Sequence, residues 1–197
     1  MVRGMHIKSV CVYCGSALGE SQAYTAQAQI LGRLLGENGI KLVYGGGRIG
    51  LMGVVAEAAM AAGGQVVGII PNHLHDWEVG HTGLTELHVV DSMHTRKRMM
   101  VEMSDAFIAM PGGMGTLDEL FEVITWKQLK LHGKPILVMN VEDYWHPLLG
   151  LIDSVVERGF ARRGAKAFFD VVPDADAVLT ALRAAPAPQI PTKPDKL

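Results

Sequence analysis

The chain has no long apolar run and no excess of basic residues. No stretch approaches the ~18 consecutive apolar residues of a membrane-spanning helix, and the opening segment MVRGMHIKSVCVYCGS has no small-residue cleavage site of a secretory leader. The 18 basic side chains stand against 20 acidic ones, which disfavours a protein whose main partner is the phosphate backbone of a nucleic acid. We therefore expect a cytoplasmic protein that contacts neither nucleic acid nor membrane.

Cysteine is also scarce, because the 197 residues include only Cys11 and Cys14. Their C-x-x-C spacing suits redox chemistry where it opens a helix in a reducing compartment. Here it lies in the run SVCVYCG, which is strand-like, so side chains three positions apart point to opposite faces. We expect two buried structural thiols and neither a redox pair nor a metal site.

Short apolar runs alternate with helix-length segments along the chain. Strands are expected at Ser9–Cys14, Lys41–Tyr44, Gln65–Ile70, Leu87–Asp91, Ala106–Met110, Pro135–Asn140 and Phe168–Val172. Helices are expected at Ser21–Glu37, Leu51–Ala62, Met93–Met103, Leu117–Leu131, Tyr144–Arg158 and Asp174–Ala184. Strands that are apolar throughout are typical of a parallel sheet with helices on both faces. The pattern predicts a single doubly wound, Rossmann-like α/β domain over residues 1–185.

Two segments interrupt this alternation. Pro71–Glu86 is long, polar and rich in Gly and His, as an active-site loop or lid would be. Residues 186–197 are Pro-rich, which excludes a helix or a central strand, so we expect an extended or disordered tail without a catalytic role. A Pro-rich peptide ligand is the alternative for this tail.

Three glycine-rich junctions follow predicted strands, where open α/β sheets bind their ligands. They are Cys14-Gly15-Ser16, the run YGGGRIGLMG from Tyr44, and the run PGGMGT from Pro111. Glycines let backbone N–H groups approach an anion, and the following helix N-terminus favours negative charge, so a phosphate fits; tight packing turns are the alternative. No Walker A sequence is present, and the junction after the first predicted strand, Cys14 to Gly19, lacks the full G-x-G-x-x-G, which favours a monophosphate ligand over ATP or a dinucleotide.

Charged residues accompany two of the predicted helices. Thr116 and Glu119 have the spacing of a capping box, worth about 1 kcal/mol, and spacing alone favours that structural role. The run MHTRKR, which starts at Met93, places three cations near the start of a helix, where the helix dipole disfavours them. We expect these cations to serve an anion or an acid, with an exposed solvated face as the alternative.

The run PGGMGTLDE from Pro111 resembles the PGGxGTxxE signature of the Lonely Guy (LOG) family of nucleoside 5′-monophosphate phosphoribohydrolases. MHTRK resembles the family's MHxRK segment, YGGGRIGLMG its YGGGxxGLMG loop, and Cys14-Gly15-Ser16 its opening CGS, over about Ser9 to Gly159. The resemblance implies hydrolysis of the N-glycosidic bond of a cytokinin riboside 5′-monophosphate or AMP to free base and ribose 5-phosphate. It implies no metal and no organic cofactor.

By this resemblance Arg96 and Glu119 are the catalytic pair. The carboxylate would stabilise an oxocarbenium-like state or orient water, and the guanidinium would hold the carboxylate ionised and contact the phosphate or the base. The resemblance assigns substrate binding to Gly15, Ser16, Gly46, Gly47, Glu78, Lys97, Gly113, Met114, Gly115, Thr116, Leu117, Asp118 and Thr125. For Glu78, which lies in the polar loop, the alternative to substrate binding is an ordinary loop carboxylate.

The resemblance also implies a homodimer whose active sites draw on both subunits, or a higher oligomer. The predicted helices Met93–Met103 and Leu117–Leu131 are rich in Met and Leu and would supply the interface, although core packing explains their apolar stripes equally well. Two other functions stay open. One is a non-catalytic carrier of a nucleotide or of molybdenum cofactor, and the other is an amino-acid decarboxylase with a Schiff-base lysine. The loop histidines His73, His75 and His81 lack the spacing of a zinc site.

Overall fold

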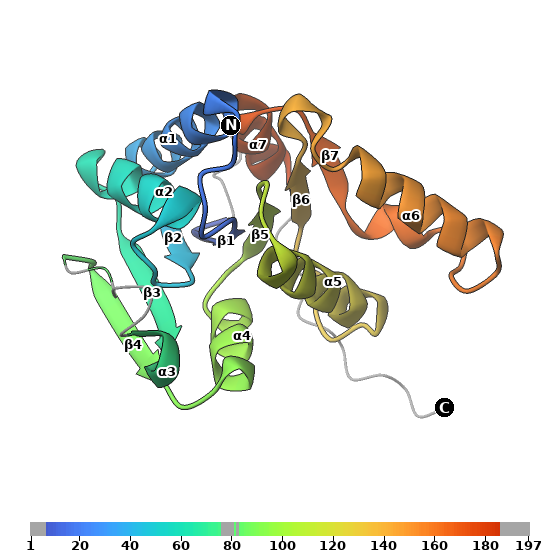
Figure 1. Ribbon diagram of the computed structural model, residues 1–197, viewed down its shortest axis with the longest axis horizontal. Coiled ribbons are helices and arrows are strands. Elements are labelled where there is room, and N and C mark those ends of the chain that lie inside the picture. The colour runs from blue at the N-terminus through green and yellow to red at the C-terminus, as the bar shows by residue number, and fades with distance from the viewer. Residues whose placement is uncertain (1–6, 76–80, 82, 186–197) are drawn as a thin grey trace, which may run out of the picture.

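The computed structural model describes residues 7–75, 81 and 83–185, which form one parallel sheet flanked by helices (Figure 1). The strands are β1 (Ser9–Tyr13), β2 (Lys41–Tyr44), β3 (Val66–Pro71), β4 (Glu86–Val90), β5 (Ala106–Ala109), β6 (Ile136–Met139) and β7 (Asp170–Val172). The α-helices are α1 (Gln22–Glu37), α2 (Gly50–Ala61), α3 (Asn72–His75), α4 (Met93–Glu102), α5 (Met114–Gln128), α6 (His146–Glu157) and α7 (Ala175–Ala184). Two short 3-10 helices, η1 (Val141–Asp143) and η2 (Ala165–Phe168), complete the described elements.

The strand order is β4-β3-β2-β1-β5-β6-β7, and every neighbouring pair is parallel. The chain therefore winds outward from β1 to β4, returns to β5 beside β1, and winds outward again to β7. Val10 pairs with Ala106 and Tyr13 with Ala109 where the direction of winding changes. Such a switch point leaves a crevice at the carboxyl ends of the two central strands. The predicted doubly wound α/β architecture is confirmed.

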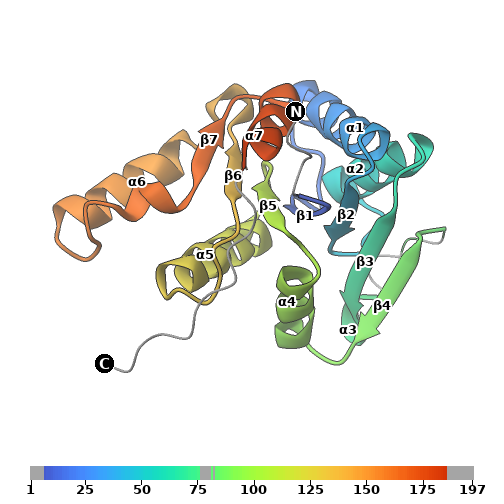
Figure 2. The same ribbon diagram turned by 180° about the vertical axis from the view of Figure 1, so that it is seen from behind.

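Helices cover both faces of the sheet, and each face has its own apolar core. Helices α1, α2 and α7 pack on one face, and α4, α5 and α6 pack on the other (Figures 1 and 2). Alternation along β1 sends Val10, Val12 and Cys14 into the first core and Cys11 and Tyr13 into the second. The sheet is buried on both sides, as its apolar strands predicted.

Every helix and strand predicted from the sequence is present, with shifts of a few residues at the ends. The sequence analysis missed α3, η1 and η2, which are too short to show a helical period. The segment Pro71–Glu86 is therefore not a loop throughout, because β3 extends to Pro71 and α3 follows directly. The Pro-rich tail 186–197 and Glu78 lie outside the described residues. None of the described helices has the length and apolar character needed to cross a membrane.

We predict that neither cysteine reacts with a thiol reagent in the native protein. Cys11 and Cys14 are buried in opposite cores, as expected, and neither forms a disulfide. Burial, reinforced by the negative charge of Glu119, raises the pKa of both thiols, so both stay protonated at neutral pH. Titration with an aromatic disulfide at pH 8 should find no free thiol before unfolding and both after it. A thiol that reacts in the native protein would contradict this assignment.

Candidate active site at the carboxyl edge of the sheet

The loops that follow β1 and β5 lie against each other at the switch point. The backbone N–H of Gly15 donates to the carbonyl of Pro111 over 3.0 Å. A side chain on Gly15 would lie 3.3 Å from the Cα of Gly112, and one on Gly112 would lie 2.8 Å from the Gly15 nitrogen. Packing therefore requires both glycines, because a Cβ at either position would separate the loops.

The loop after β2 joins these two. The N–H of Leu51 donates to the carbonyl of Ala17 over 3.4 Å, which ties the start of α2 to the loop after β1. Gly50 has a φ of 61°, a left-handed conformation that glycine adopts without strain. All three glycine-rich junctions found in the sequence therefore meet at one edge of the sheet.

Helix α5 begins three residues earlier than predicted. Its N-cap is Gly113, whose backbone is extended with φ −89° and ψ −158°, and no side chain accepts a hydrogen bond at this end. Thr116 lies inside the first turn and is buried, so the predicted capping box of Thr116 and Glu119 is wrong. The physical reason is that the flexible Gly113 lets the helix start at Met114. The first N–H groups of α5 are left without a capping side chain.

The glycines at the start of α5 have room around them. A Cβ built on Gly113 or Gly115 would meet nothing within 4 Å, and neither residue has a positive φ. Neither packing nor backbone strain therefore requires glycine at these two positions, in contrast to Gly15 and Gly112. The missing side chains expose the backbone N–H groups at the positive end of the helix dipole, which is a suitable place for a phosphate.

A buried ion pair lies between α4 and α5. The side chains of Arg96 and Glu119 are 7% and 11% exposed, and Nη2 of Arg96 lies 4.0 Å from Oε1 of Glu119. The same Nη2 donates to the carbonyl of Gly45 over 3.3 Å. The pair therefore connects both helices with the loop after β2. Removal of one partner from a buried pair leaves an uncompensated charge, which typically costs about 3–5 kcal/mol.

Lys97 of α4 also links the two helices, through ion pairs with two acidic residues of α5. Its Nζ lies 3.1 Å from a carboxylate oxygen of Asp118 and 3.1 Å from one of Glu122. Partial burial lowers the pKa of Lys97. The hydrogen bonds and negative charges of Asp118 and Glu122 together raise this pKa by more than burial lowers it, so the net shift is upward. The expectation that the cations of α4 serve an acid is confirmed for Arg96 and Lys97. Arg98 instead lies on the exposed face.

A hollow of about 190 Å³ opens beside the joined loops, on the α1 side of the switch point. Gly15, Ser16, Gly112 and Gly113 line it, together with two tyrosines. The hydroxyl of Tyr144 donates to the carbonyl of Gly112, and its ring meets that of Tyr24 edge to face at 5.9 Å. Sequence reasoning missed both tyrosines, since no motif contains them and only the packing of α1 against η1 brings them to the loop.

The structure brings most of the predicted site residues to this edge. Those that gather there are Gly15, Ser16, Gly46, Gly47, Arg96, Lys97, Gly113, Met114, Gly115, Thr116, Leu117, Asp118 and Glu119. Thr125 does not join them. It lies on the exposed side of α5, in a groove lined by Phe121, Ile124 and Leu151.

We predict that Gly45→Ala lowers activity with little effect on folding. A methyl group at Gly45 would collide with the guanidinium of Arg96, which is the flexible end of a side chain and moves more easily than backbone. For a group with the catalytic role that the family resemblance gives to Arg96, a displacement of about 1 Å can cost on the order of 100-fold in rate. Enzyme assays and thermal melting should show that loss in kcat/KM with a similar melting temperature.

Gly150→Ala is the matched control, because a Cβ on Gly150 would meet nothing within 4 Å. It adds the same methyl group within α6, and its activity should stay that of the wild type. An unimpaired Gly45→Ala protein would contradict a functional position for Arg96.

The fold and the site define an α/β protein of the doubly wound class, with three glycine-rich loops and a buried Arg–Glu pair at its switch point. The chain belongs to the family described as "Possible lysine decarboxylase", whose model matches residues 52–182. It is 45% identical over 177 residues to a cytokinin riboside 5′-monophosphate phosphoribohydrolase of Rhodococcoides fascians, covering 89% of each chain. It is 46% identical over 173 residues to the cytokinin riboside 5′-monophosphate phosphoribohydrolase LOG of Oryza sativa subsp. japonica, covering 88% of this chain and 72% of that one. The resemblance to the LOG family is confirmed.

Solved structures share the fold at low identity. The molybdenum cofactor carrier protein of Chlamydomonas reinhardtii matches with a TM-score of 0.67 at 17% identity, over 89% of this chain and 96% of that one. The molybdenum cofactor binding protein of Rippkaea orientalis matches with a TM-score of 0.66 at 20% identity, over 89% and 94% of the two chains. These matches show a common architecture.

Proposed function

We propose that the protein hydrolyses the N-glycosidic bond of a cytokinin riboside 5′-monophosphate or of AMP, releasing the free base and ribose 5-phosphate. The observation that carries this proposal is the buried pair of Arg96 and Glu119, placed between the glycine loop after β2 and helix α5, whose glycine-rich start has no capping side chain. The names of relatives that are nearly half identical over most of the chain support the same reaction.

The substrate phosphate binds at the start of α5. The backbone N–H groups of Gly113, Met114 and Gly115 donate to its oxygens, and the helix dipole favours its charge. Ser16 adds a hydroxyl from the neighbouring loop, where it lines the same hollow as Gly113. Asp118 holds Lys97 and so contributes to the position of α4 relative to α5. This site binds a monophosphate through backbone groups, so it needs no metal ion.

Cleavage breaks the bond between C1′ of the ribose and the ring nitrogen of the base. A water molecule supplies hydroxide to C1′ and a proton to the departing base, so the reaction consumes one water for each base released. The transition state carries positive charge on the ribose, which the carboxylate of Glu119 stabilises while it orients the water. Arg96 balances the charge of Glu119 in the buried site and presents a planar guanidinium to the phosphate or the base.

A decarboxylase reaction receives less support from this site. A Schiff-base lysine must reach its neutral amine form, which a lowered pKa favours. The pKa of Lys97 is shifted upward, and its Nζ is held by Asp118 and Glu122. Lys97 therefore stays a protonated link between helices.

We further propose that the protein acts as a homodimer in the cytoplasm. The groove that contains Thr125 is bordered by exposed apolar side chains, among them Phe121 at 39% and Leu151 at 55% exposed. If a second copy covers this groove, Thr125 of one subunit lies near the active site of the other. This arrangement would explain why Thr125 lies apart from the other predicted site residues of its own subunit. Light scattering after size exclusion should give twice the monomer mass, and Leu151→Glu should lower that mass.

Base release is the direct test of the reaction. Purified protein is incubated with AMP and with isopentenyladenosine 5′-monophosphate, and free base and ribose 5-phosphate are quantified by chromatography. We expect equal amounts of the two products from at least one substrate, and the ratio of the two kcat/KM values gives the preferred base. Binding of AMP without release of base would instead support a nucleotide carrier. Release of carbon dioxide from lysine with added pyridoxal phosphate would support a decarboxylase.

A further inference from the structure

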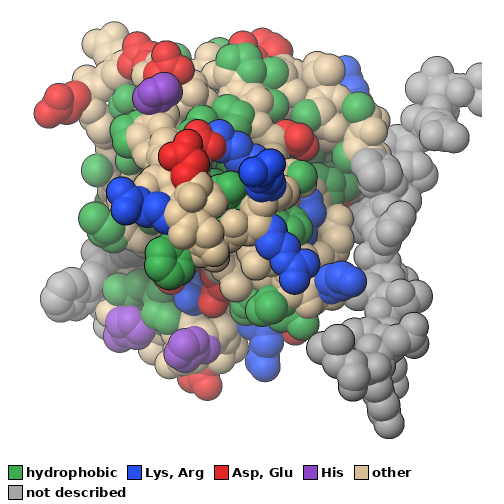
Figure 3. All heavy atoms as spheres, turned by 90° about the vertical axis from the view of Figure 1, so that its right-hand side faces the viewer, with side chains coloured by type: hydrophobic (Ala, Val, Ile, Leu, Met, Phe, Trp, Pro, Cys, Tyr) green, Lys and Arg blue, Asp and Glu red, His purple; other side chains and the backbone are tan. Residues whose placement is uncertain are grey.

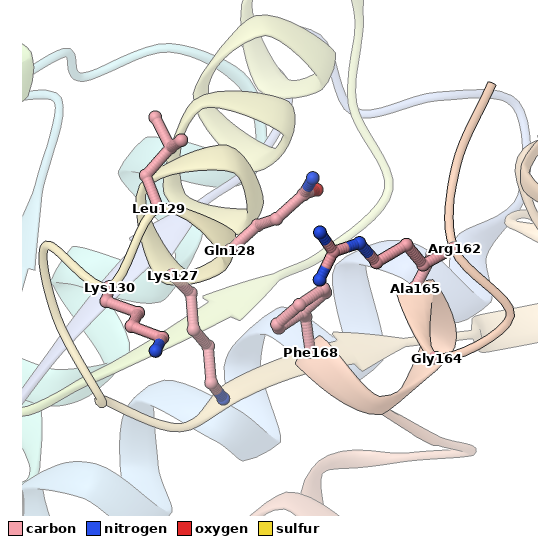
Figure 4. A pocket seen from close by; sticks show the side chains of 8 residues that line it. All are labelled: Lys127, Gln128, Leu129, Lys130, Arg162, Gly164, Ala165 and Phe168. Atoms are coloured by element: carbon pink, nitrogen blue, oxygen red, sulfur yellow. The ribbon is translucent and has the colours of Figure 1, made fainter. Parts of the chain in front are cut away.

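A second cavity lies at the other end of α5, away from the proposed active site. Its volume is about 520 Å³, and it opens between the C-terminal end of α5 and the segment around η2. Figure 4 shows the side chains that surround it. Lys127 stands thirteen residues after Met114, which places it about 20 Å along the helix from the proposed phosphate cradle. The lining residues are Lys127, Gln128, Leu129, Lys130, Arg162, Gly164, Ala165 and Phe168.

Three of these described lining residues are basic and none is acidic. Figure 4 shows the amines of Lys127 and Lys130 extending in a similar direction from the end of α5, while Arg162 reaches toward Phe168 from the other wall. Burial lowers the pKa of Lys127, and the negative charge of Asp170 only partly opposes that shift. The side of the molecule seen in Figure 3 carries lysine and arginine side chains among apolar, acidic and histidine side chains. The three cations, with no acidic side chain in the described lining, favour an anion in this cavity.

Lys130 occupies a position where the fold itself favours glycine. Its φ is 61°, and its N–H donates to the carbonyl of Lys127 over 3.0 Å, while the N–H of Leu131 donates to that of Trp126 over 2.9 Å. These two bonds form a Schellman motif, whose left-handed residue is usually glycine. A non-glycine residue there is strained by about 1 kcal/mol or more. The sequence thus places a cation at the cavity against the local backbone preference.

The walls between the cations are apolar. Phe168 is half-buried at the floor, Leu129 is 62% exposed, and Ala165 and Gly164 leave the space beside them open. A cavity of this size matches a ligand of nucleotide dimensions. We propose that this cavity binds a nucleoside polyphosphate, with the phosphates on Lys127, Lys130 and Arg162 and the base against Leu129, which does not line the groove that contains Thr125. This site is separate from the one proposed to hydrolyse the monophosphate.

The test measures ATP binding by isothermal titration calorimetry with saturating ribose 5-phosphate, which occupies the cradle at the start of α5. The informative variant is Lys130→Gly, because glycine relieves the strained backbone and so keeps the fold at least as stable. Lys166→Gln is the matched control: it removes one charge from η2, but Lys166 pairs with Asp153 and does not line the cavity. Inorganic triphosphate and adenosine are titrated in parallel to separate the phosphate and base contributions.

We expect ATP to bind wild type and Lys166→Gln equally, and Lys130→Gly at least about tenfold more weakly, with a melting temperature no lower than wild type. ATP should bind more tightly than triphosphate or adenosine alone. The proposal is overturned if ribose 5-phosphate abolishes ATP binding, if Lys130→Gly binds ATP as the wild type does, or if Lys166→Gln weakens binding as much as Lys130→Gly.

Discussion

Replacement of Glu119 by glutamine is expected to lower kcat for base release by a factor of about 100 to 1000, with a small effect on KM. The amide keeps the size of the side chain but removes the negative charge that stabilises the ribose cation. The start of α5 should survive the change, since Gly113 and not the predicted capping box begins this helix. KM should change little because the phosphate is bound mainly by backbone groups.

Two measurements make this result interpretable. Thermal melting reports the structural effect, since Arg96 loses its buried partner and some destabilisation is expected. Glu102→Gln removes the same charge from the exposed side of α4, where Glu102 is 68% exposed, and should release base at the wild-type rate. A folded Glu119→Gln protein with the kcat of the wild type would contradict a catalytic role for this carboxylate.

Replacement of Gly113 by aspartate is expected to move activity and stability in opposite directions. Aspartate is a preferred N-cap, and a Cβ at this position meets nothing within 4 Å, so the variant should melt about 1–3 °C higher than the wild type. The same carboxylate occupies the N–H groups proposed to bind the phosphate and repels its charge. KM for AMP should therefore rise by at least about 100-fold.

Gly113→Ala separates the charge from the space that a side chain takes up. Alanine adds only a methyl group, so its KM should change by less than about tenfold, although it lacks the capping gain. Saturation kinetics with AMP give KM, and thermal melting gives the stability, for the wild type, Gly113→Asp and Gly113→Ala. If Gly113→Asp keeps the KM of the wild type, the phosphate binds elsewhere.

The sequence by itself was enough for the architecture. Apolar strands that alternate with helix-length segments satisfy their hydrogen bonds and bury both faces only in a parallel sheet covered on two sides. The opposite orientation of Cys11 and Cys14 follows from the two-residue period of a strand, and burial of both thiols in opposite cores agrees with it. The short helices α3 and η2 escaped prediction because one turn is too short to establish a period.

The site was predictable only where local motifs define it. The convergence of the glycine loops was expected from their places after the strands, because carboxyl ends of parallel strands share one edge. The capping prediction failed because the spacing of Thr116 and Glu119 says nothing of where Gly113 starts the helix. The hydrogen bond of Tyr144 to Gly112 joins residues thirty-two positions apart, and no local pattern signals such a contact.

Sequence therefore determined the order of strands and helices, the burial of the two thiols and the three loops able to meet an anion, since these depend on periodicity and on the properties of single residues. The pairing of Arg96 with Glu119 was expected from the family resemblance, and the structure places the two side chains together. Tertiary structure alone decided the other charge contacts: Lys97 bridges Asp118 and Glu122, and Lys127, Lys130 and Arg162 share a cavity without an acidic residue in its described lining. The physical reason is that a charge interaction depends on distance and burial, and only the packing of α4, α5 and η2 sets these for residues far apart in the chain.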